Sequence, residues 1–250
     1  MLSLPKFIGV NNYMRMFVQD DVFGIVVKNT IALAVVVGPA GFMLAFLLAW
    51  LVNEFSTGLR TIFSFMFYAP SLVGNAYFIW QVAFSGDSYG YINSLLLSLG
   101  IITEPVVWLK NATYLMPIII VVQLWQSMGV SFLANISGLQ NVNDELYEAG
   151  AIDGIKNRFQ ELWHITIPNM KHMLLFGAVM QIANMFSVGQ VTQELTGGYL
   201  SIEGSTLTII NHMTDYGTVR YEMGYASAVA VVLFLLVWAT KKIVFKLLSW

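Results

Sequence analysis

Five long intervals of this chain contain no Asp, Glu, Lys or Arg and are mostly apolar, and residues 22–27 extend the first of them. A helix that crosses a bilayer needs about 20 consecutive, predominantly apolar residues. Helix is the expected state because a backbone in lipid must satisfy its hydrogen bonds within the segment. The pattern predicts an all-α integral membrane protein with five transmembrane helices, over residues 22–52, 61–84, 113–136, 172–193 and 223–240.

Composition supports the membrane class. Hydrophobic residues make up 57% of the 250 residues, charged residues only 10%, and the mean hydropathy is +0.70. A soluble domain carries about 25% charged residues, so too few charges are present here to cover a water-facing surface. The net charge of −2 does not suggest nucleic acid, and the absence of cysteine excludes a disulfide framework. With no repeat or linker, residues 1–250 are predicted to form one domain.

The connecting segments differ in character. Residues 88–103 are apolar but short, which favours an interfacial or re-entrant helix. Residues 194–222 hold several glycines among polar residues, which indicates a folded loop. Residues 137–171 form the most charged stretch of the chain. Five spans put the termini on opposite sides, with seven Lys or Arg on the side of the 137–171 loop and the C-terminus against five on the other. This bias favours a cytoplasmic loop and a cytoplasmic C-terminus.

The 137–171 loop has its own helical pattern. Asn143 or Asp144 can cap a short helix, Gly154 should break it, and a second helix is expected from about Ile155 to His164. Pro168 then ends that helix or starts the next span. Small residues at 149–151 would let a partner backbone approach closely, and nearby carboxylates would offer charge to it. An ordinary amphipathic helix at the membrane surface is the alternative.

This loop resembles the cytoplasmic signature loop of bacterial binding-protein-dependent ABC importer permeases. That signature reads E-A-A-x-x-x-G and then I-x-L-P, and the matching residues here are Glu148, Ala149, Gly150, Asp153, Gly154, Ile165, Ile167 and Pro168. Gly150 stands where the family usually has Ala, and Ile167 where it usually has Leu. The loop lies between the third and fourth spans counted here, as in the family.

Three further segments resemble carbohydrate permeases of the maltose and oligosaccharide type. Residues 7–13 resemble the region before their first core span, residues 195–207 their extracellular L-T-x-G-G-P … S-T-x-T-L loop, and residues 224–228 the start of their last span. Such proteins usually have six or more spans, with one before the segment that starts near Phe7. The chain is therefore either a shortened form or lacks its true N-terminus.

The resemblance implies a permease subunit in a bacterial cell membrane. Such subunits work with a second permease subunit, two cytoplasmic ATPase subunits and an extracellular or periplasmic solute-binding protein. Glu148, Ala149 and Asp153 would contact the ATPase, Gly154 would set the turn, and Gly150 and Pro168 complete the matching loop. The sequence has no G-x-x-x-x-G-K-[ST] motif, so ATP and magnesium are expected in the partner ATPase, with no cofactor or catalytic residue in this chain.

Polar residues within the spans are candidates for a solute path, because polar groups in lipid are costly and tend to face the bundle interior. Amides and aromatic rings suit sugars, whose hydroxyls need donors and acceptors. The candidates are Tyr68, Asn75, Gln123, Gln126, Gln181, Asn184 and Ser187. Hydrogen bonds between helices are the alternative, and they explain Asn, Gln and Ser in membrane helices well. The three histidines are scattered without ligand spacing, so no metal site is expected.

Other functional classes remain open from the sequence. An importer for a peptide or another polar solute would share the signature loop. An ion-coupled secondary transporter usually shows an intramembrane acid, and none of the five span cores here contains Asp or Glu. A membrane enzyme would need a clustered nucleophile, base or metal set, which is not apparent. A scaffold would use the same loop to bind another soluble partner.

Overall fold

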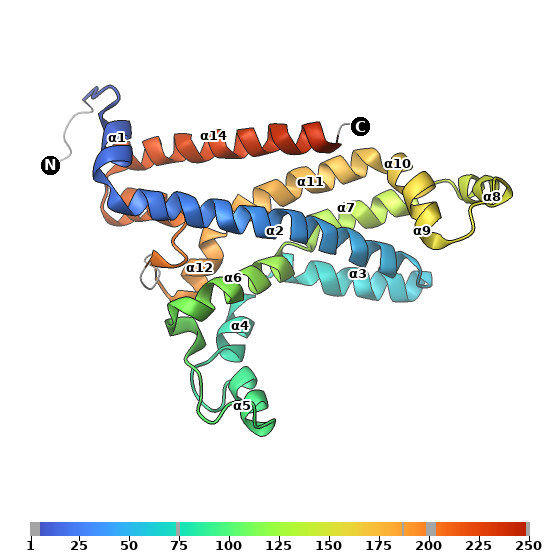
Figure 1. Ribbon diagram of the computed structural model, residues 1–250, viewed down its shortest axis with the longest axis horizontal. Helices are drawn as coiled ribbons and strands as arrows, with labels where there is room; N and C mark the ends of the chain where they lie inside the picture. The colour runs from blue at the N-terminus through green and yellow to red at the C-terminus, as the bar shows by residue number, and fades with distance from the viewer. Residues whose placement is uncertain (1–5, 74–75, 187, 199–203, 249–250) are drawn as a thin grey trace. The chain divides into compact units, whose positions relative to one another are not determined.

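The computed structural model describes residues 6–73, 76–186, 188–198 and 204–248. The regular structure in these ranges is helical, and no strand occurs among them. Two helices are each long and apolar enough to cross a membrane: α2, Asp21–Asn53, and α14, Met223–Leu248. Three pairs of shorter helices pass the same test only in combination, which gives up to five spans. The prediction of an all-α membrane protein with about five spans is confirmed (Figure 1).

The three middle spans are each divided into two helices, which hydropathy alone does not reveal. Residues 61–84 fall in α3, Thr57–Leu72, and α4, Tyr77–Ala83. Residues 113–136 fall in α6, Ala112–Gln126, and α7, Gly129–Gln140. Residues 172–193 fall in α11, Lys171–Phe186, and α12, Gly189–Thr196. At the first break Pro70 occupies the last turn of α3, and Val73 after it is extended.

The last helix is longer than its charge-free interval. α14 continues to Leu248, although the sequence predicted an end at residue 240. Lys241, Lys242 and Lys246 lie within it. Lysine is a good helix former, and its long side chain can carry the charge toward the membrane surface. A charge therefore ends the apolar interval without ending the helix.

The described parts of the connecting segments also contain helices. Their helices are α1 (Asn11–Met14), η1 (Arg15–Gln19), α5 (Tyr91–Ser98), η2 (Trp108–Lys110), α8 (Asp144–Ile152), α9 (Arg158–Glu161), η3 (Leu162–Thr166), α10 (Ile167–Asn169), α13 (Ile209–Thr214) and η5 (Asp215–Val219). α5 lies within the predicted short helix at 88–103. The fully buried Asn93 holds this segment together: its amide donates to three backbone carbonyls, and its oxygen accepts from Val106 N and Trp108 Nε1.

The chain divides into two compact units. Unit 1 comprises the described residues within Met1–Val35, Tyr77–Ile120 and Phe186–Ala239, and unit 2 those within Val36–Ala76, Val121–Met185 and Thr240–Trp250. Helices α2, α6, α11 and α14 have residues in both units. The interpretation of residues 1–250 as a single permease domain stays a prediction.

Unit 2 packs its helices around small residues. Its core joins Ala45, Ala49 and Val52 of α2 to Phe132, Ile136 and Leu139 of α7, with Phe63 and Phe67 of α3 against them. Gly129 lets α3 approach α7, because a Cβ at this position would lie 2.5 Å from the Cβ of Ser71. Lipid offers little hydrophobic drive between helices, so such close van der Waals packing is what stabilises the unit.

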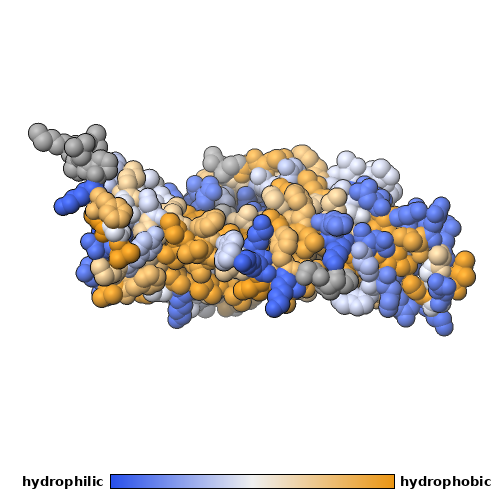
Figure 2. All heavy atoms as spheres, turned by 90° about the horizontal axis from the view of Figure 1, so that it is seen from above, coloured by the Kyte–Doolittle hydropathy of each residue, from blue (hydrophilic) through white to orange (hydrophobic). Residues whose placement is uncertain are grey.

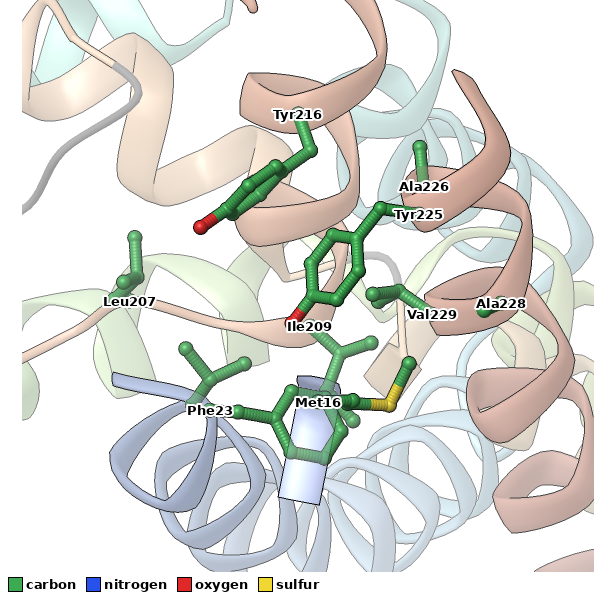
Figure 3. Packing of buried hydrophobic residues seen from close by; sticks show 10 residues of the cluster. Met16, Phe23, Leu207, Ile209, Tyr216, Tyr225, Ala226, Ala228 and Val229 are labelled. Carbon is green, nitrogen blue, oxygen red and sulfur yellow. The ribbon is translucent and has the colours of Figure 1, made fainter. Parts of the chain in front are cut away.

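Unit 1 has a core that joins the two ends of the sequence. Met16, Phe23 and Val26 pack with Tyr225 and Val229 of α14 and with side chains of the 207–216 segment (Figure 3). Arg15 extends this contact, since it forms an ion pair with Glu222 and lies over the rings of Tyr216 and Tyr225. Residues 207–222 of the loop that was predicted to be folded are thereby fixed to the segment that precedes the first span, whereas residues 199–203 lie outside the described residues.

A buried polar cluster lies beside this core. Asp20 accepts hydrogen bonds from the Tyr225 hydroxyl and from the His212 Nε2, which lies 2.9 Å away. His212 is only 4% exposed, and burial lowers its pKa more than the nearby Asp20 raises it. Burial alone would raise the pKa of Asp20, but the hydrogen bond from Tyr225 and the adjacent His212 lower it on balance. A neutral imidazole that donates to a carboxylate is the arrangement favoured at neutral pH.

The outward faces of the long helices are apolar. Phe234, Leu235 and Trp238 of α14 are exposed, and only 11% of the most apolar window of that helix is buried. Figure 2 shows hydrophobic side chains over much of the visible face, with hydrophilic ones more frequent around α8 and α9. Exposed apolar helix faces of this length suit contact with lipid.

Candidate functional site

The helix α8 in the 137–171 loop begins and ends with strong local signals. Asn143 is the N-cap, and its side-chain oxygen accepts from the Glu145 N–H at 3.1 Å. At the other end Gly154 has φ +96°, in the region that favours glycine. The Gly154 and Ile155 N–H groups donate back to the carbonyls of Ala151 and Gly150. This is a Schellman ending, which needs a left-handed residue at Gly154.

Gly150 faces its own chain. It is buried, and a Cβ at this position would lie 2.6 Å from Ile165 Cδ1 and 3.0 Å from Ile155 Cδ1. The Tyr147 hydroxyl adds a hydrogen bond to Thr166 Oγ1, at 2.9 Å. The sequence interpretation took Gly150 with its small neighbours as a surface for a partner. In the structure this glycine instead lets α8 pack against η3, and so holds α8 in a fixed orientation.

The opposite side of α8 is open. Glu148, Ala149 and Asp153 are exposed, as is Gly154. Pro168 is also exposed, within the short α10 that precedes α11. The second helix of the loop begins at Arg158, later than the predicted Ile155, because Asn157 caps it by accepting from Gln160 N–H. Of the six candidate coupling residues, Glu148, Ala149, Asp153 and Gly154 lie on or beside the open face of α8, whereas Gly150 and Pro168 do not.

Sequence reasoning missed the exposed apolar residues of this loop. Ile152 is 87% exposed, Phe159 73% and Trp163 70%. Large apolar side chains this exposed in the most charged loop of the chain are unusual, and they are typical of a surface that contacts another protein or a membrane. The signal in the sequence that could have identified them was the presence of large apolar residues within a polar segment. The open face of α8 therefore combines its carboxylates with the apolar side chain of Ile152.

A polar cleft of about 620 Å³ lies beside α8. It is lined by Trp50, Asn53, Glu54, Phe55, Ser56, Arg60, Leu139, Asp144, Tyr147, Glu148, Arg158, Glu161 and Thr166. Arg158 bridges Glu54 at 3.0 Å and Glu161 at 2.8 Å, and its hydrogen bond with Glu161 raises the pKa of its guanidinium further. The ion pair with Glu54 ties the α2–α3 turn to the loop. Both ions are largely exposed, so its stabilising effect is small.

A second group of candidates lies between helices of unit 2. Gln123 of α6 is 2% exposed and donates to the carbonyl of Asn184 at 3.0 Å. Gln181 of α11 is equally buried and donates to the carbonyl of Val37 at 3.2 Å. Gln126 and Tyr68 are partly buried, the latter near Gly129. The structure thus brings Gln123, Asn184 and Gln181 into one polar layer with α2, through bonds between helices. Asn75 and Ser187 lie outside the described residues.

Several polar atoms in this layer lack partners. The side-chain oxygens of Gln123, Gln126 and Gln181 are buried and accept no hydrogen bond from any described residue. Asn135 and Ser131 of α7, which sequence reasoning did not single out, are also fully buried, and Ser131 donates to the carbonyl of Gly177. Their spacing of four residues on one helix was the signal. Unpaired acceptors in a low-dielectric interior are costly, which makes this layer a candidate for binding hydrogen-bond donors.

Comparison with known proteins adds to this geometry. Residues 38–247 match the family model described as "Binding-protein-dependent transport system inner membrane component". The chain is 30% identical to the lactose transport system permease protein LacF of Rhizobium radiobacter, over 93% of this chain and 78% of LacF. It is 29% identical to the arabinooligosaccharides transport system permease protein AraP of Bacillus subtilis, over 97% of this chain and 76% of AraP.

The fold is also known from experiment. A chain in the crystal structure of a bacterial alginate ABC transporter, in complex with an alginate pentasaccharide-bound periplasmic protein, superposes with a TM-score of 0.81. The match covers 94% of this chain and 81% of that chain, at 22% sequence identity. At this identity the likeness establishes the fold.

Proposed function

Because this chain belongs to the family of binding-protein-dependent transport system inner membrane components, we propose that it forms part of the membrane pathway of an ATP-driven sugar importer. The chain is a multi-pass membrane protein with up to five spans. The solute would be a sugar or an oligosaccharide. Permeases named for lactose and for arabinooligosaccharides are 30% and 29% identical to this chain over nearly its whole length, which supports that class of solute.

The observation that carries the proposal is the form of α8. It is capped at Asn143, ended by the left-handed Gly154 and fixed underneath by Gly150, so its open face is held rigidly. Glu148, Ala149 and Asp153 on or beside that face are proposed to contact a cytoplasmic ATPase subunit, together with the exposed Ile152. Fixed geometry is what a helix needs if it is to transmit the movement of a partner.

ATP and magnesium would be bound by the ATPase, and this chain would supply no catalytic residue. Closure of two ATPase subunits around ATP would move α8 here and its equivalent in a second permease subunit. The spans would then change between inward-open and outward-open arrangements by rigid-body movement. The Tyr147–Thr166 hydrogen bond would connect α8 to η3, and the ion pair between Arg158 and Glu54 would connect the following α9 to the end of the first span.

A periplasmic or extracellular solute-binding protein would deliver the solute. The alginate transporter of similar fold was solved with such a protein, which supports this assignment. The excess of Lys and Arg on the α8 side supports a cytoplasmic location for α8 and for the C-terminus. Within the membrane, the buried amides of Gln123 and Gln181 are proposed to exchange hydrogen bonds with sugar hydroxyls as the helices rearrange.

The first experiment is mass spectrometry of the proteins that co-purify with this chain from mild detergent. Recovery of an ATPase subunit, a second permease subunit and a solute-binding protein is expected. Recovery of the chain alone, under conditions that preserve a known importer, would contradict the proposal. The purified complex is then reconstituted in proteoliposomes, where ATP-dependent uptake of labelled lactose and labelled arabinotriose tests the solute class.

A further inference from the structure

Gly41 of α2 lies directly against the side chain of Gln181 from α11. A Cβ at position 41 would overlap the Nε2 of Gln181, well inside the 3.0 Å limit that real Cβ contacts respect. It would also lie 2.8 Å from the Ser127 Oγ. The Gln181 amide therefore occupies the space in which any side chain at position 41 would begin.

The overlap follows from the direction of the Cα–Cβ bond in a helix. Cα–Cβ bonds of a helix tilt toward its N-terminus, so a side chain at position 41 would cover the surface near the Val37 carbonyl, one turn earlier. That carbonyl is the acceptor of the Gln181 amide, at 3.2 Å. Because glycine leaves the carbonyl open, Gln181 can reach it. The amide nitrogen is thereby fixed, and with it the buried oxygen, which accepts no hydrogen bond from a described residue.

We infer that Gly41 is a positioning residue for the solute path, acting through Gln181. Its bare Cα sets where the unpaired oxygen of Gln181 lies, and so where an acceptor is available to a hydroxyl of the solute. This inference rests on the proposed function. If Gly41 served only the packing of α2 against α11, a methyl group at position 41 would push the two helices apart. The atom it would meet first is the far end of a flexible side chain, which moves more readily than a helix.

Gly38 of the same helix provides a matched control. A Cβ there would lie 2.6 Å from the sulfur of Met185, which is also on α11 and is also the flexible end of a side chain. The two glycines therefore share a helix and a partner helix, and at both the first atom met is the flexible end of a side chain, although the conflict at Gly41 is closer and also involves Ser127. Only at Gly41 does the conflict fall on an amide. Gly38→Ala consequently measures the effect of crowding α2 against α11 without moving Gln181.

The test compares Gly41→Ala, Gly38→Ala, Gln181→Ala and the double variant Gly41→Ala/Gln181→Ala in the complete complex. The probes are labelled lactose and labelled arabinotriose, taken up by ATP-loaded proteoliposomes. Gly41→Ala should raise the apparent KM by about 3- to 10-fold, the equivalent of roughly one misplaced hydrogen bond, with little change in maximal rate. Gly38→Ala should leave the KM close to that of the wild type.

The double variant separates positioning from packing. If Gly41 acts through Gln181, Gly41→Ala adds no further change once the amide is absent, whereas independent effects would add. Additivity, or equal effects of Gly41→Ala and Gly38→Ala, would overturn the inference.

A cryo-electron microscopy structure of the Gly41→Ala complex gives a readout that needs no transport. The Gln181 amide should have left the Val37 carbonyl while α2 and α11 keep their spacing. An amide still bound to Val37, with the helices moved apart, would overturn the inference. If the wild-type complex takes up neither sugar, the proposed solute class is wrong, and this structure still decides the role of Gly41.

Discussion

At the scale of single residues, burial decides what the polar side chains of this chain can do. Asp20, His212 and Tyr225 form a closed set of hydrogen bonds in unit 1, whereas Gln123 and Gln181 in unit 2 each use one amide hydrogen and leave an oxygen unpaired. The first arrangement stabilises one conformation. In the second, each unpaired oxygen costs free energy in any conformation that offers it no donor. Such side chains are suited to changing hydrogen-bond partners during transport.

The first prediction concerns acid and His212. Burial lowers the pKa of His212 below its usual 6.5, so the unfolded or opened segment binds a proton more readily than the folded one. The stability contributed by the neutral imidazole is therefore present above about pH 6.5 and lost as the pH falls below it. Tyr216, Asp215 and Arg220 also face or surround the ring, and Arg220 further lowers its pKa.

Lowering the pH from about 7.5 to about 5.5 should reduce the thermal denaturation midpoint of the wild type in detergent. His212→Gln, which can still donate to Asp20, should show a smaller reduction. His172→Gln is the control, because His172 is exposed and should leave the acid response unchanged. Equal pH dependence in the wild type and His212→Gln, followed by differential scanning fluorimetry, would contradict this account.

At the scale of elements, α8 is defined by its ends more than by its interior. Its cap at Asn143 and its Schellman ending at Gly154 fix nine residues, Asp144–Ile152, in a short helix that could not persist alone. The packing of Gly150 against Ile165 supplies the remaining stabilisation of this helix. The element is therefore stable only in its docked position, which suits the proposed role in coupling.

The second prediction tests the ending of α8. Gly154→Ala should strain the backbone at φ +96°, at a cost of about 1–2 kcal/mol, and reorient the end of the helix. ATP-dependent uptake should fall at least several-fold while the amount of protein in the membrane is retained. Gly58→Ala is the matched control, because Gly58 is exposed, has no positive φ and has open space around its Cα. Normal uptake by Gly154→Ala would remove α8 from the mechanism.

The third prediction tests the apolar part of the open face. Ile152→Ser should weaken retention of the ATPase subunit at least about tenfold, because an isoleucine buried at an interface contributes about 1.5–3 kcal/mol. The comparison variant is Ile101→Ser, which changes an equally apolar residue, 65% exposed, in a different segment. Retention is measured by immunoblot after size-exclusion chromatography in detergent. Equal retention in both variants would show that Ile152 does not contact the ATPase.

At the scale of the whole molecule, orientation in the membrane remains a proposal and can be measured directly. The chain contains no cysteine, so single cysteines can be introduced without background labelling. Glu104→Cys should react with a membrane-impermeant maleimide in intact spheroplasts, from which the outer layers of the cell envelope have been removed. Lys156→Cys should react only after permeabilisation. Both positions are exposed in the structure. The reverse pattern would contradict the proposed cytoplasmic location of α8.

The sequence by itself determined the class, the approximate spans and the chemistry of α8. Charge-free apolar intervals fix spans because lipid excludes charge, and the caps at Asn143 and Gly154 act within a few residues of chain. These are local effects, so a linear pattern carries them. The resemblance of the loop to a permease signature rested on the same local residues, and the family model confirmed it.

The tertiary structure alone decided which groups meet. The close approach of α3 to α7 depends on Ser71 lying against Gly129, a contact that no hydropathy profile contains. The inward role of Gly150, the contact of Gly41 with Gln181 and the burial of His212 beside Asp20 all join residues distant in sequence. Each depends on packing between helices, where a single Cβ or one amide decides the arrangement, and local patterns do not encode that geometry.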